Sequence, residues 1–532
     1  MTTDYDVIVI GSGAGGLTAA VALAQAGKKV LVCEQHTAPG GWTQSFTLNG
    51  YRFSPGVHYI GTLHPGGHLR RIYEGLGVSG DMAFYELNPD GYDHIFLGKE
   101  RFDYPKGKDN LIRRLKDRFP DQANGIDRYF STLVRLMENI DALGKISSPL
   151  RAVKSAGKIA FVLKWLRRTG QDLLDAYLTD PVLKGVLSGQ AGDYGLPPSQ
   201  ASVFMQAGIT YHYLNGAWYP KGGGFAIPRA FIRALKRAGG EIRLNTPVTQ
   251  VLLDGRKAAG VQLADGSKIL ANLVVSNADP EVTLGKLVGR QHLSAGLRRK
   301  LDRVKYSVSA VSLFFAVDMD LRAAGLDSGN YWFYRSENVD QLYRLAQSDH
   351  LLTADEPPAF FLTVTTLKDP TKMRNGHHTC EMFCFVGYDA FKKWQNQPCG
   401  ARSQDYQELK KSLAAKMFTA LDRRIPGIRE HVVFWDLATP LTNAHYLNST
   451  FGNLYGTAKT PDQVGPGSFP VKTEIEGLYM VGASTLSHGI AGATATGLAA
   501  AKQILRCKTN DLLKMNGPQL TLLPAEPQEN HV

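Results

Sequence analysis

The stretch DYDVIVIGSGAGGLTAAVALAQAGKKVLVCEQ, residues 4–35, decides the fold of this chain. Residues 7–10 form an uninterrupted apolar run, which is typical of a parallel strand buried on both faces. Glycines follow in the spacing GxGxxG, and the alanine-rich residues 17–26 predict a helix closed by Gly27. Residues 29–33 predict a second strand. The stretch therefore predicts a strand–turn–helix–strand unit of an α/β protein.

Each glycine of the turn has its own use. Gly11 permits the tight turn, Gly13 lets a pyrophosphate approach the backbone, and Gly16 lets the helix pack closely on the strand. The helix N-terminus offers free N–H groups to phosphates. Glu34 ends the second strand, where a carboxylate can accept hydrogen bonds from ribose hydroxyls and disfavours a 2′-phosphate. The unit predicts dinucleotide binding, and the alternative is a glycine-rich turn without a ligand.

The far end of the chain returns to the same pattern. In EGLYMVGASTLSHGIAGATATGLAAAKQIL, residues 476–505, we expect a strand over 478–481, a turn at Gly482 and a helix over 491–505. A further glycine pair, Gly40 and Gly41, follows Glu34 within a few residues. Glycine turns at both ends of the chain suit a long ligand such as FAD. The C-terminal helix would aim its positive end at the flavin ring, where negative charge develops on reduction.

Several further stretches carry a resemblance to a known family. They are YPKGGGFAIPRAF (219–231), NTPVTQV (245–251), VVSNADP (274–280) and GLYMVGAST (477–485). With the first stretch, they resemble the phytoene desaturase and carotenoid isomerase superfamily of FAD-dependent oxidoreductases. GVHYIG (56–61) and NAHYLNSTFGNLYG (443–456) are closer to its retinol saturase branch. The resemblance spans nearly the whole chain, and its blocks stand in the order of the family.

The resemblance implies a set of FAD contacts. The pyrophosphate would lie on Gly11, Ser12, Gly13, Ala14, Gly15 and Gly16; the adenosine on Glu34, Gln35 and Val248; and the flavin and ribityl chain on Gly40, Gly41, Trp42, Gly482, Ala483, Gly489, Ile490 and Ala491. The chain departs from the family at two points. Ser487-His488 replaces a Pro-Gly pair found in many desaturases, and Ala483 stands where many related flavoproteins have an acid.

The resemblance also implies a domain plan. We expect an FAD-binding Rossmann-type domain from residues 1–70, 219–290 and 441–507, with an antiparallel hairpin region inserted over 239–278. It is interrupted by a mixed α+β substrate domain from residues 71–218, mostly helical, and 291–440, with strands over an apolar cavity. Residues 508–532 are expected to form a loose tail.

The implied chemistry acts on carbon–carbon bonds of an apolar polyene, namely a retinoid, a carotenoid or a related isoprenoid. GVHYIG favours saturation of a double bond, which needs a proton as well as a hydride. Candidate proton donors are His58, Tyr59, His445, Tyr446 and His488. GVHYIG reads as a strand, so His58 and Tyr59 would point to opposite faces and at most one would meet substrate. Either could equally be a core residue.

Other functions stay open at this stage. Desaturation or redox-neutral isomerisation would use the same scaffold, and a flavin-free prenyl-lipid escort protein or an amine oxidase has a similar architecture. The aromatic run 211–220 would line the substrate tunnel or pack beneath the flavin domain. No second GxGxxG unit is present for a bound nicotinamide cofactor, so the electron donor stays unknown.

The net charge of +12 indicates an anionic partner. No nucleic-acid-binding signature is present. Residues 150–170 instead interleave apolar side chains with Arg151, Lys154, Lys158, Lys164, Arg167 and Arg168. This pattern suits either an interfacial helix on an anionic membrane or an ordinary solvated helix. With no signal peptide and no spanning segment expected, the sequence predicts a cytoplasmic protein with peripheral membrane contact.

The five scattered cysteines argue against a disulfide scaffold. His378, Cys380 and Cys384 share one face of an expected strand, but no fourth ligand is evident, so we expect no metal site.

Overall fold

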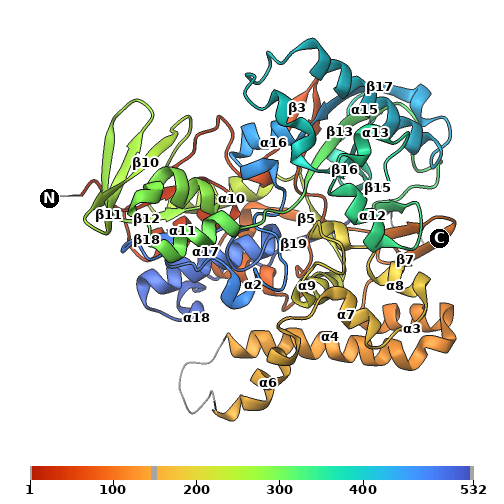
Figure 1. The fold of residues 1–532 in the computed structure, drawn as a ribbon, viewed down its shortest axis with the longest axis horizontal. Helices are drawn as coiled ribbons and strands as arrows, with labels where there is room; N and C mark the ends of the chain where they lie inside the picture. The colour runs from red at the N-terminus through yellow and green to blue at the C-terminus, as the bar shows by residue number, and fades with distance from the viewer. Residues whose placement is uncertain (1–2, 145–152, 528–532) are drawn as a thin grey trace.

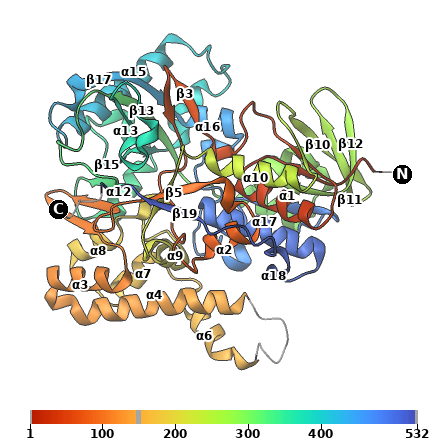
Figure 2. The ribbon, with the colours of Figure 1, turned by 180° about the vertical axis from the view of Figure 1, so that it is seen from behind.

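The computed structural model describes residues 3–144 and 153–527, and two seven-stranded sheets form its framework. The nucleotide-domain sheet and the substrate-domain sheet lie at opposite ends of the longest axis (Figure 1). Figure 2 shows the same arrangement from behind, with helices α4 and α6 along one edge of the molecule. The fold is α/β, with a Rossmann-type sheet and a mixed sheet, as the sequence predicted.

The nucleotide-domain sheet contains the predicted first strand at its centre. Its order is β10-β11-β12-β1-β2-β9, with β18 on the other side of part of β12. The bounds are β1 Tyr5–Ile10, β2 Val30–Cys33, β9 Glu241–Arg243, β10 Val248–Asp254, β11 Lys257–Leu263, β12 Lys268–Ser276 and β18 Leu478–Met480. β1 pairs in parallel with β2 and β12, and β12 pairs in parallel with β18. The two ends of the chain therefore meet in one sheet.

Both faces of β1 are buried, which explains its continuous apolar sequence. Val7 and Val9 pack toward helices α1 (Ala14–Gln25), α10 (Ala226–Arg237) and α17 (Gly489–Leu505). Ile8 and Ile10 face the opposite core, which contains β10, β11 and helix α11 (Ala295–Arg303). The predicted antiparallel hairpins are confirmed, because β11 pairs antiparallel with both β10 and β12.

The substrate-domain sheet has the order β17-β13-β16-β15-β14-β6-β7. Its strands are β6 Asp93–Leu97, β7 Glu100–Tyr104, β13 Ser309–Val317, β14 Asn330–Tyr334, β15 Ala359–Val364, β16 His378–Val386 and β17 Val432–Ala438. The strands expected from 291–440 are confirmed. The expectation of a mostly helical 71–218 was incomplete, because it missed β5 (Ala83–Glu86) as well as β6 and β7. The polar and charged residues of β6 and β7 hide the alternation that marks a strand.

Helices cover the substrate-domain sheet on both faces. One face packs against the helices of residues 108–213, and the other against α15 (Gln404–Asp422). The first group comprises α3 Lys108–Arg118, α4 Ala123–Leu143, α6 Ala156–Trp165, α7 Gly170–Asp175, α8 Pro181–Leu187 and α9 Val203–Tyr213. Shorter helices include α12 Val339–Ala346, α13 His350–Thr353, α14 Thr365–Lys368 and α16 Pro440–Leu447. Among the described residues, no helix is long and apolar enough to cross a bilayer.

The C-terminal segment is ordered over its described part, so the prediction of a loose tail is wrong there. α18 (Thr509–Leu512) is followed by β19 (Thr521–Pro524), which pairs in parallel with β5 (Ala83–Glu86). β5 also pairs with β8 (Trp218–Pro220), and α2 (His68–Gly75) packs nearby. Glu526 then accepts a hydrogen bond from the Ser328 N–H at 2.7 Å. The tail is held by long-range pairing, which its polar composition does not reveal.

Three features complete the description. β3 (Phe46–Leu48) and β4 (Tyr51–Phe53) form a small hairpin beneath the substrate-domain sheet. In β16, Cys380 and Cys384 are fully buried in the core, and the ring of His378 shares a hydrogen bond with the Thr366 hydroxyl. Of the basic stretch 150–170, residues 150–152, including Arg151, lie outside the described residues.

Candidate flavin and substrate site

A cavity of about 1600 Å³ lies between the two sheets. One side is made by glycine-rich backbone from both ends of the chain. We call this side the glycine wall and define it by Gly13, Gly40, Gly41, Gly482 and Gly489, all of which line the cavity. The sequence predicted each of these residues as a cofactor contact, and the fold brings them together.

The glycine wall exposes backbone because its turns have little room for side chains. Gly11 and Gly482 adopt left-handed φ angles of +88° and +95°, which favour glycine. A Cβ at Gly15 would lie 2.9 Å from the Gly482 nitrogen and 3.0 Å from the Ala493 oxygen. Helices α1 and α17 both begin at this wall, and the first-turn N–H groups of a helix have no partner within it. These donors and the close backbone fit the phosphates of a dinucleotide.

Asn277 joins the parts of the glycine wall, and the prediction missed it. Its Oδ1 accepts a hydrogen bond from the Gly16 N–H at 3.0 Å. A Cβ added to Gly482 would lie 3.0 Å from the same Asn277 Oδ1. The residue stands in VVSNADP, which carried the family resemblance, directly after β12. Its position at the carboxyl end of a parallel strand was the signal that could have identified it.

Glu34 is buried and has partners within the protein. Its Oε2 accepts hydrogen bonds from the Ser12 N–H at 2.9 Å and the Ser12 hydroxyl at 2.6 Å. The Ser12 hydroxyl oxygen in turn accepts the Gly40 N–H at 2.9 Å. Glu34 therefore ties the first glycine turn to the second. Gln35 is exposed and Val248 begins β10; neither lines the cavity, and their contact with an adenosine stays a prediction.

Ala483, which departs from the family pattern expected from the sequence, has a buried lysine beside it. Lys459 donates a hydrogen bond from Nζ to the Ala483 carbonyl at 2.7 Å. Burial lowers the pKa of this lysine to about 7. Lys459 was not among the residues predicted from the sequence. When protonated, it places a positive charge beside the turn at Gly482 and Ala483.

His58 and Tyr59 both line the cavity. The expected strand over GVHYIG is wrong: β4 ends at Phe53, and only Ile60 forms an isolated bridge, to Trp218. Without strand alternation, both side chains reach the cavity. The His58 Nδ1 lies 3.3 Å from the Glu381 Oε2, although these two atoms do not form a hydrogen bond of good geometry.

The other predicted proton donors divide into two groups. His445 and Tyr446 are exposed on α16 and lie outside the cavity lining, which instead includes Leu447 and the loop after it. The two side chains therefore lie outside the cavity. His488 is buried and lines the cavity, and its Nε2 hydrogen-bonds the Asp193 carbonyl at 2.8 Å. Burial and the Lys459 charge lower the pKa of His488 to about 4.

Behind His58 and Tyr59 lies a set of polar side chains that the sequence analysis missed. We call it the polar layer and define it by Asp93, Gln190, Asn330, Trp332 and Lys368. Lys368 donates to the His58 carbonyl at 2.7 Å and to the Asn330 side chain. Asp93 accepts hydrogen bonds from Gln190 at 2.7 Å, Asn330 at 3.2 Å and Trp332 at 3.3 Å. All five residues of the polar layer are buried.

The pKa values of the polar layer follow from its burial. Burial raises the pKa of Asp93 to about 6, against the hydrogen bonds that stabilise its carboxylate. Burial lowers the pKa of Lys368 to about 7, against the charges of Asp93 and Glu381. At a pH between these two values, Asp93 is mostly a carboxylate and Lys368 is mostly an ammonium ion.

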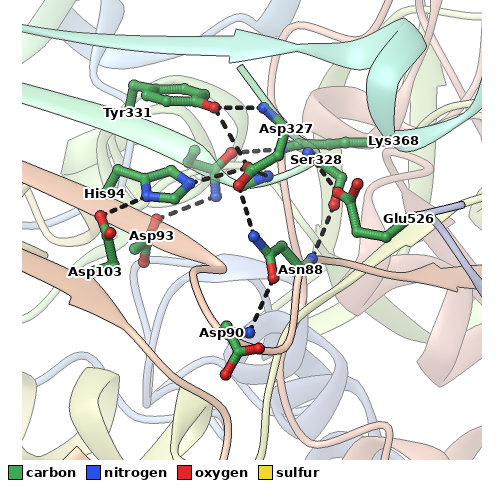
Figure 3. Close-up of polar contacts among 12 residues, drawn as sticks. Asn88, Asp90, Asp93, His94, Asp103, Asp327, Ser328, Tyr331, Lys368 and Glu526 are labelled. Atoms are coloured by element: carbon green, nitrogen blue, oxygen red, sulfur yellow. Dashed lines mark hydrogen bonds and ion pairs between the residues drawn. The ribbon is translucent and has the colours of Figure 1, made fainter. Parts of the chain in front are cut away.

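A second network continues from this layer, as Figure 3 shows for Lys368, Asp93, His94 and their neighbours. The His94 ring lies between Asp103, at 2.6 Å, and Asp327, at 2.9 Å. Burial lowers the pKa of His94, but the hydrogen bonds and charges of the two carboxylates outweigh it and raise the pKa to about 9. Asn88 hydrogen-bonds the side chains of both Asp327 and Ser328. Glu526 of the C-terminal segment accepts a hydrogen bond from the Ser328 N–H.

The part of the cavity away from the glycine wall is largely apolar. Aromatic rings of the substrate-domain sheet line it at Trp332, Phe361 and Phe383. Helices α4 and α9 contribute Met137, Ile140, Phe204, Met205 and Ile209. From the aromatic run 211–220, Tyr211 and Tyr213 line the cavity, whereas Trp218 and Tyr219 are buried in the core. The cavity can therefore hold a long apolar molecule beside the glycine wall.

Comparison with known proteins agrees with this site. Residues 14–505 match the family described as flavin containing amine oxidoreductase, and the chain belongs to that family. The chain is 30% identical over 527 residues to the all-trans-retinol 13,14-reductase of Danio rerio, covering 94% of this chain and 86% of that protein. It is 26% identical over 517 residues to prolycopene isomerase 1, chloroplastic, of an Oncidium hybrid cultivar, covering 94% and 84%.

The chain is thus a flavin-dependent oxidoreductase of the retinol saturase and carotenoid isomerase branch, as the motifs indicated. The fold also agrees with a solved oxidoreductase from Methanosarcina mazei. That structure covers 93% of this chain and 100% of its own, with a TM-score of 0.60 at 17% identity.

Proposed function

We propose that this protein binds FAD and saturates a carbon–carbon double bond of an extended apolar polyene, such as a retinoid or carotenoid. The observation that carries the proposal is the cavity itself, with donor-rich backbone on one side and aromatic and aliphatic side chains on the other. The similarity to an all-trans-retinol 13,14-reductase supports a reduction. When bound, reduced FAD supplies a hydride to one carbon of the double bond.

The residues of this chain have three tasks in such a reaction. The glycine wall and Asn277 would hold the pyrophosphate and the ribityl chain through backbone and amide groups. Trp332, Phe361 and Phe383 would exclude water and align the polyene by apolar contact. His58, or Tyr59 with its partner, would provide the proton that the second carbon requires.

Redox-neutral isomerisation is the second candidate, and the similarity to a prolycopene isomerase favours it. The family membership and the intact glycine wall favour a flavoenzyme over a flavin-free escort protein. Desaturation would use the same cavity, with electrons flowing in the opposite direction.

The first experiment is a visible spectrum of the purified protein, with release and identification of the bound nucleotide. FAD is expected. The photoreduced protein is then mixed without oxygen with all-trans-retinol and, separately, with prolycopene. A product two mass units heavier supports saturation, and an equal mass with a changed retention time supports isomerisation. A product two units lighter from the oxidised protein supports desaturation. A protein that binds no flavin would contradict the proposal.

We also propose that α6 and the residues around it place the cavity against an anionic membrane. α6 packs on α4, and the C-terminal half of α4 lines the cavity at Met137 and Ile140. Val153 and Leu163 are 73% and 59% exposed, so both apolar side chains are available for contact with lipid. The neighbouring basic residues Lys154, Lys158, Lys164, Arg167 and Arg168 are exposed as well. An apolar substrate could then enter from the lipid phase.

Charge reversal tests this membrane contact. Lys164, Arg167 and Arg168 replaced together by Glu should abolish flotation with vesicles of phosphatidylcholine and phosphatidylserine. Arg298, Arg299 and Arg303 of α11 are also exposed, and their triple replacement by Glu changes the net charge equally. This control should still float. Equal binding of both variants would contradict the proposal.

A further inference from the structure

We propose that Asp193 is the acid that protonates the substrate carbon, and that Tyr59 holds its carboxyl group in position. This inference deepens the proposed function and rests on it. Asp193 was not among the five proton donors that the sequence suggested.

Three contacts hold Asp193 and Tyr59 in place. The Tyr59 hydroxyl donates a hydrogen bond to the Asp193 Oδ2 at 2.6 Å. The Tyr59 ring stacks on Tyr213, with ring centroids 4.2 Å apart and planes 7° apart. His488 bonds the Asp193 carbonyl at 2.8 Å, which holds the backbone. Tyr59 and Asp193 both line the cavity, so the acid is positioned against the space where substrate would lie.

The surroundings of Asp193 favour its protonated form. Burial raises its pKa well above the usual value, and the charge of Asp93 raises it further, while the hydrogen bond from Tyr59 lowers it. Asp93, in contrast, accepts three hydrogen bonds and is linked to Lys368 through Asn330. Two acidic groups in such unequal environments take different roles, one charged and one able to donate a proton. The other titratable groups that interact with Asp193 are Tyr59, Tyr92, Tyr194, Tyr213, Tyr334, Tyr455 and His488.

The rival donors are less suited to the task. His488, with a pKa of about 4, holds no transferable imidazolium proton at neutral pH. The pKa of Tyr59 is raised well above 10 by burial and by the charge of Asp193, so its own proton is weakly acidic. His58 lines the cavity beside Glu381 and remains the direct competitor.

The proposed step is balanced. One carbon of the double bond accepts a hydride from reduced flavin, and the other accepts the proton of the Asp193 carboxyl group. The π bond is lost, two C–H bonds form and the flavin is oxidised by two electrons. Asp193 is left as a carboxylate that stays bonded to Tyr59, and it recovers a proton from water that enters the cavity after product leaves.

The first test measures flavin reoxidation by all-trans-retinol in single turnovers without oxygen, between pH 6 and pH 9. Asp193→Asn should retain flavin but react at least about 100-fold more slowly at every pH, the usual scale for loss of a general acid. Tyr59→Phe should react more slowly and lose its rate at a higher pH than wild type, because a donor that stabilises the carboxylate is gone. Asp117→Asn, an exposed site on α3, is the matched control and should behave as wild type.

The second test needs no substrate. The infrared spectrum of wild type minus that of Asp193→Asn, at pH 7, cancels the flavin bands and should contain the C=O stretch of a protonated carboxylic acid. Absence of this band would overturn the proposal even if the enzyme saturates polyenes. An unchanged rate in Asp193→Asn, or a larger loss in His58→Asn than in Asp193→Asn, would also overturn it. Failure of the wild type to reduce any polyene would overturn the proposed function, and this inference with it.

Discussion

The glycine wall lines the cavity and most of the polar layer lies behind its lining, and the two regions hold their functional groups in different ways. The wall presents backbone from short turns, and each turn is set by a few neighbouring residues. The layer presents side chains that come from distant segments: Asp93 is on β6, Gln190 precedes a short turn, and Lys368 ends α14. The wall depends on space for the backbone. The layer depends on buried polar and charged side chains that compensate one another. Substitutions should therefore fail by different mechanisms in the two regions.

The largest effect is expected from Lys368→Met in the polar layer. Removing the ammonium group takes away the positive charge that favours the Asp93 carboxylate and leaves the His58 carbonyl without the Lys368 donor. Leaving a buried charge without its compensating partner costs about 3–5 kcal/mol of unfolding free energy. Urea unfolding at pH 7 measures this loss. Lys411→Met, at an exposed position of α15, should change the unfolding free energy little. A loss below about 1 kcal/mol would mean that the layer contains no charge pair.

The sequence could predict the glycine wall but not the polar layer, for a physical reason. GxGxxG, Glu34 and the turn at Gly482 act through local backbone geometry, so their spacing already indicates a phosphate site. Asp93, Asp193 and Lys368 give no such pattern, because each is a single polar residue within an ordinary-looking segment. Asp93 and Lys368 approach one another only when β6, β14 and α14 are brought together, and Asp193 lies on a separate short turn, residues 191–193. The wrong prediction of a strand at His58 and Tyr59 has a similar origin. Their segment alternates like a strand, but in the fold only Ile60 pairs with another segment, at Trp218.

The second prediction concerns the stability of the layer's extension around His94. Its pKa of about 9 in the folded protein exceeds the usual value near 6.5. Its contribution to stability is therefore complete below about pH 6.5 and is lost as the pH rises through about 9. The loss should be on the order of 3 kcal/mol. Urea midpoints between pH 6 and pH 9.5 test this, in a range where Asp103 and Asp327, whose pKa values are lowered, stay ionised.

His94→Gln provides the comparison for that titration. The variant should be less stable than wild type at pH 6, and its stability should depend less on pH over the same range. His292→Gln, at an exposed position, should reproduce the wild-type slope. Equal slopes in wild type and His94→Gln would show that the two carboxylates do not hold a protonated imidazole.

The smallest effect is expected from Gly15→Ala, in the first turn of α1 directly behind the glycine wall. The added methyl group would lie 2.8 Å from the Asn277 Oδ1, 2.9 Å from the Gly482 nitrogen and 3.0 Å from the Ala493 oxygen. Two of these atoms belong to the backbone, so α1 and α17 must separate. Such overpacking costs about 1–3 kcal/mol. Because the wall would hold the flavin, a comparable part of this cost should appear as about 10-fold to 100-fold weaker flavin binding.

Gly157→Ala separates this effect from helix propensity. Gly157 lies within α6, and a Cβ there would meet no atom within 4 Å. The same substitution should therefore leave flavin binding unchanged and slightly stabilise its helix. Flavin retained after gel filtration, together with the thermal midpoint, measures both variants. If Gly15→Ala weakened folding but retained flavin fully, the wall would serve only helix packing. Loss of flavin with a smaller loss of stability than in Lys368→Met would instead confirm that the two regions fail in different ways.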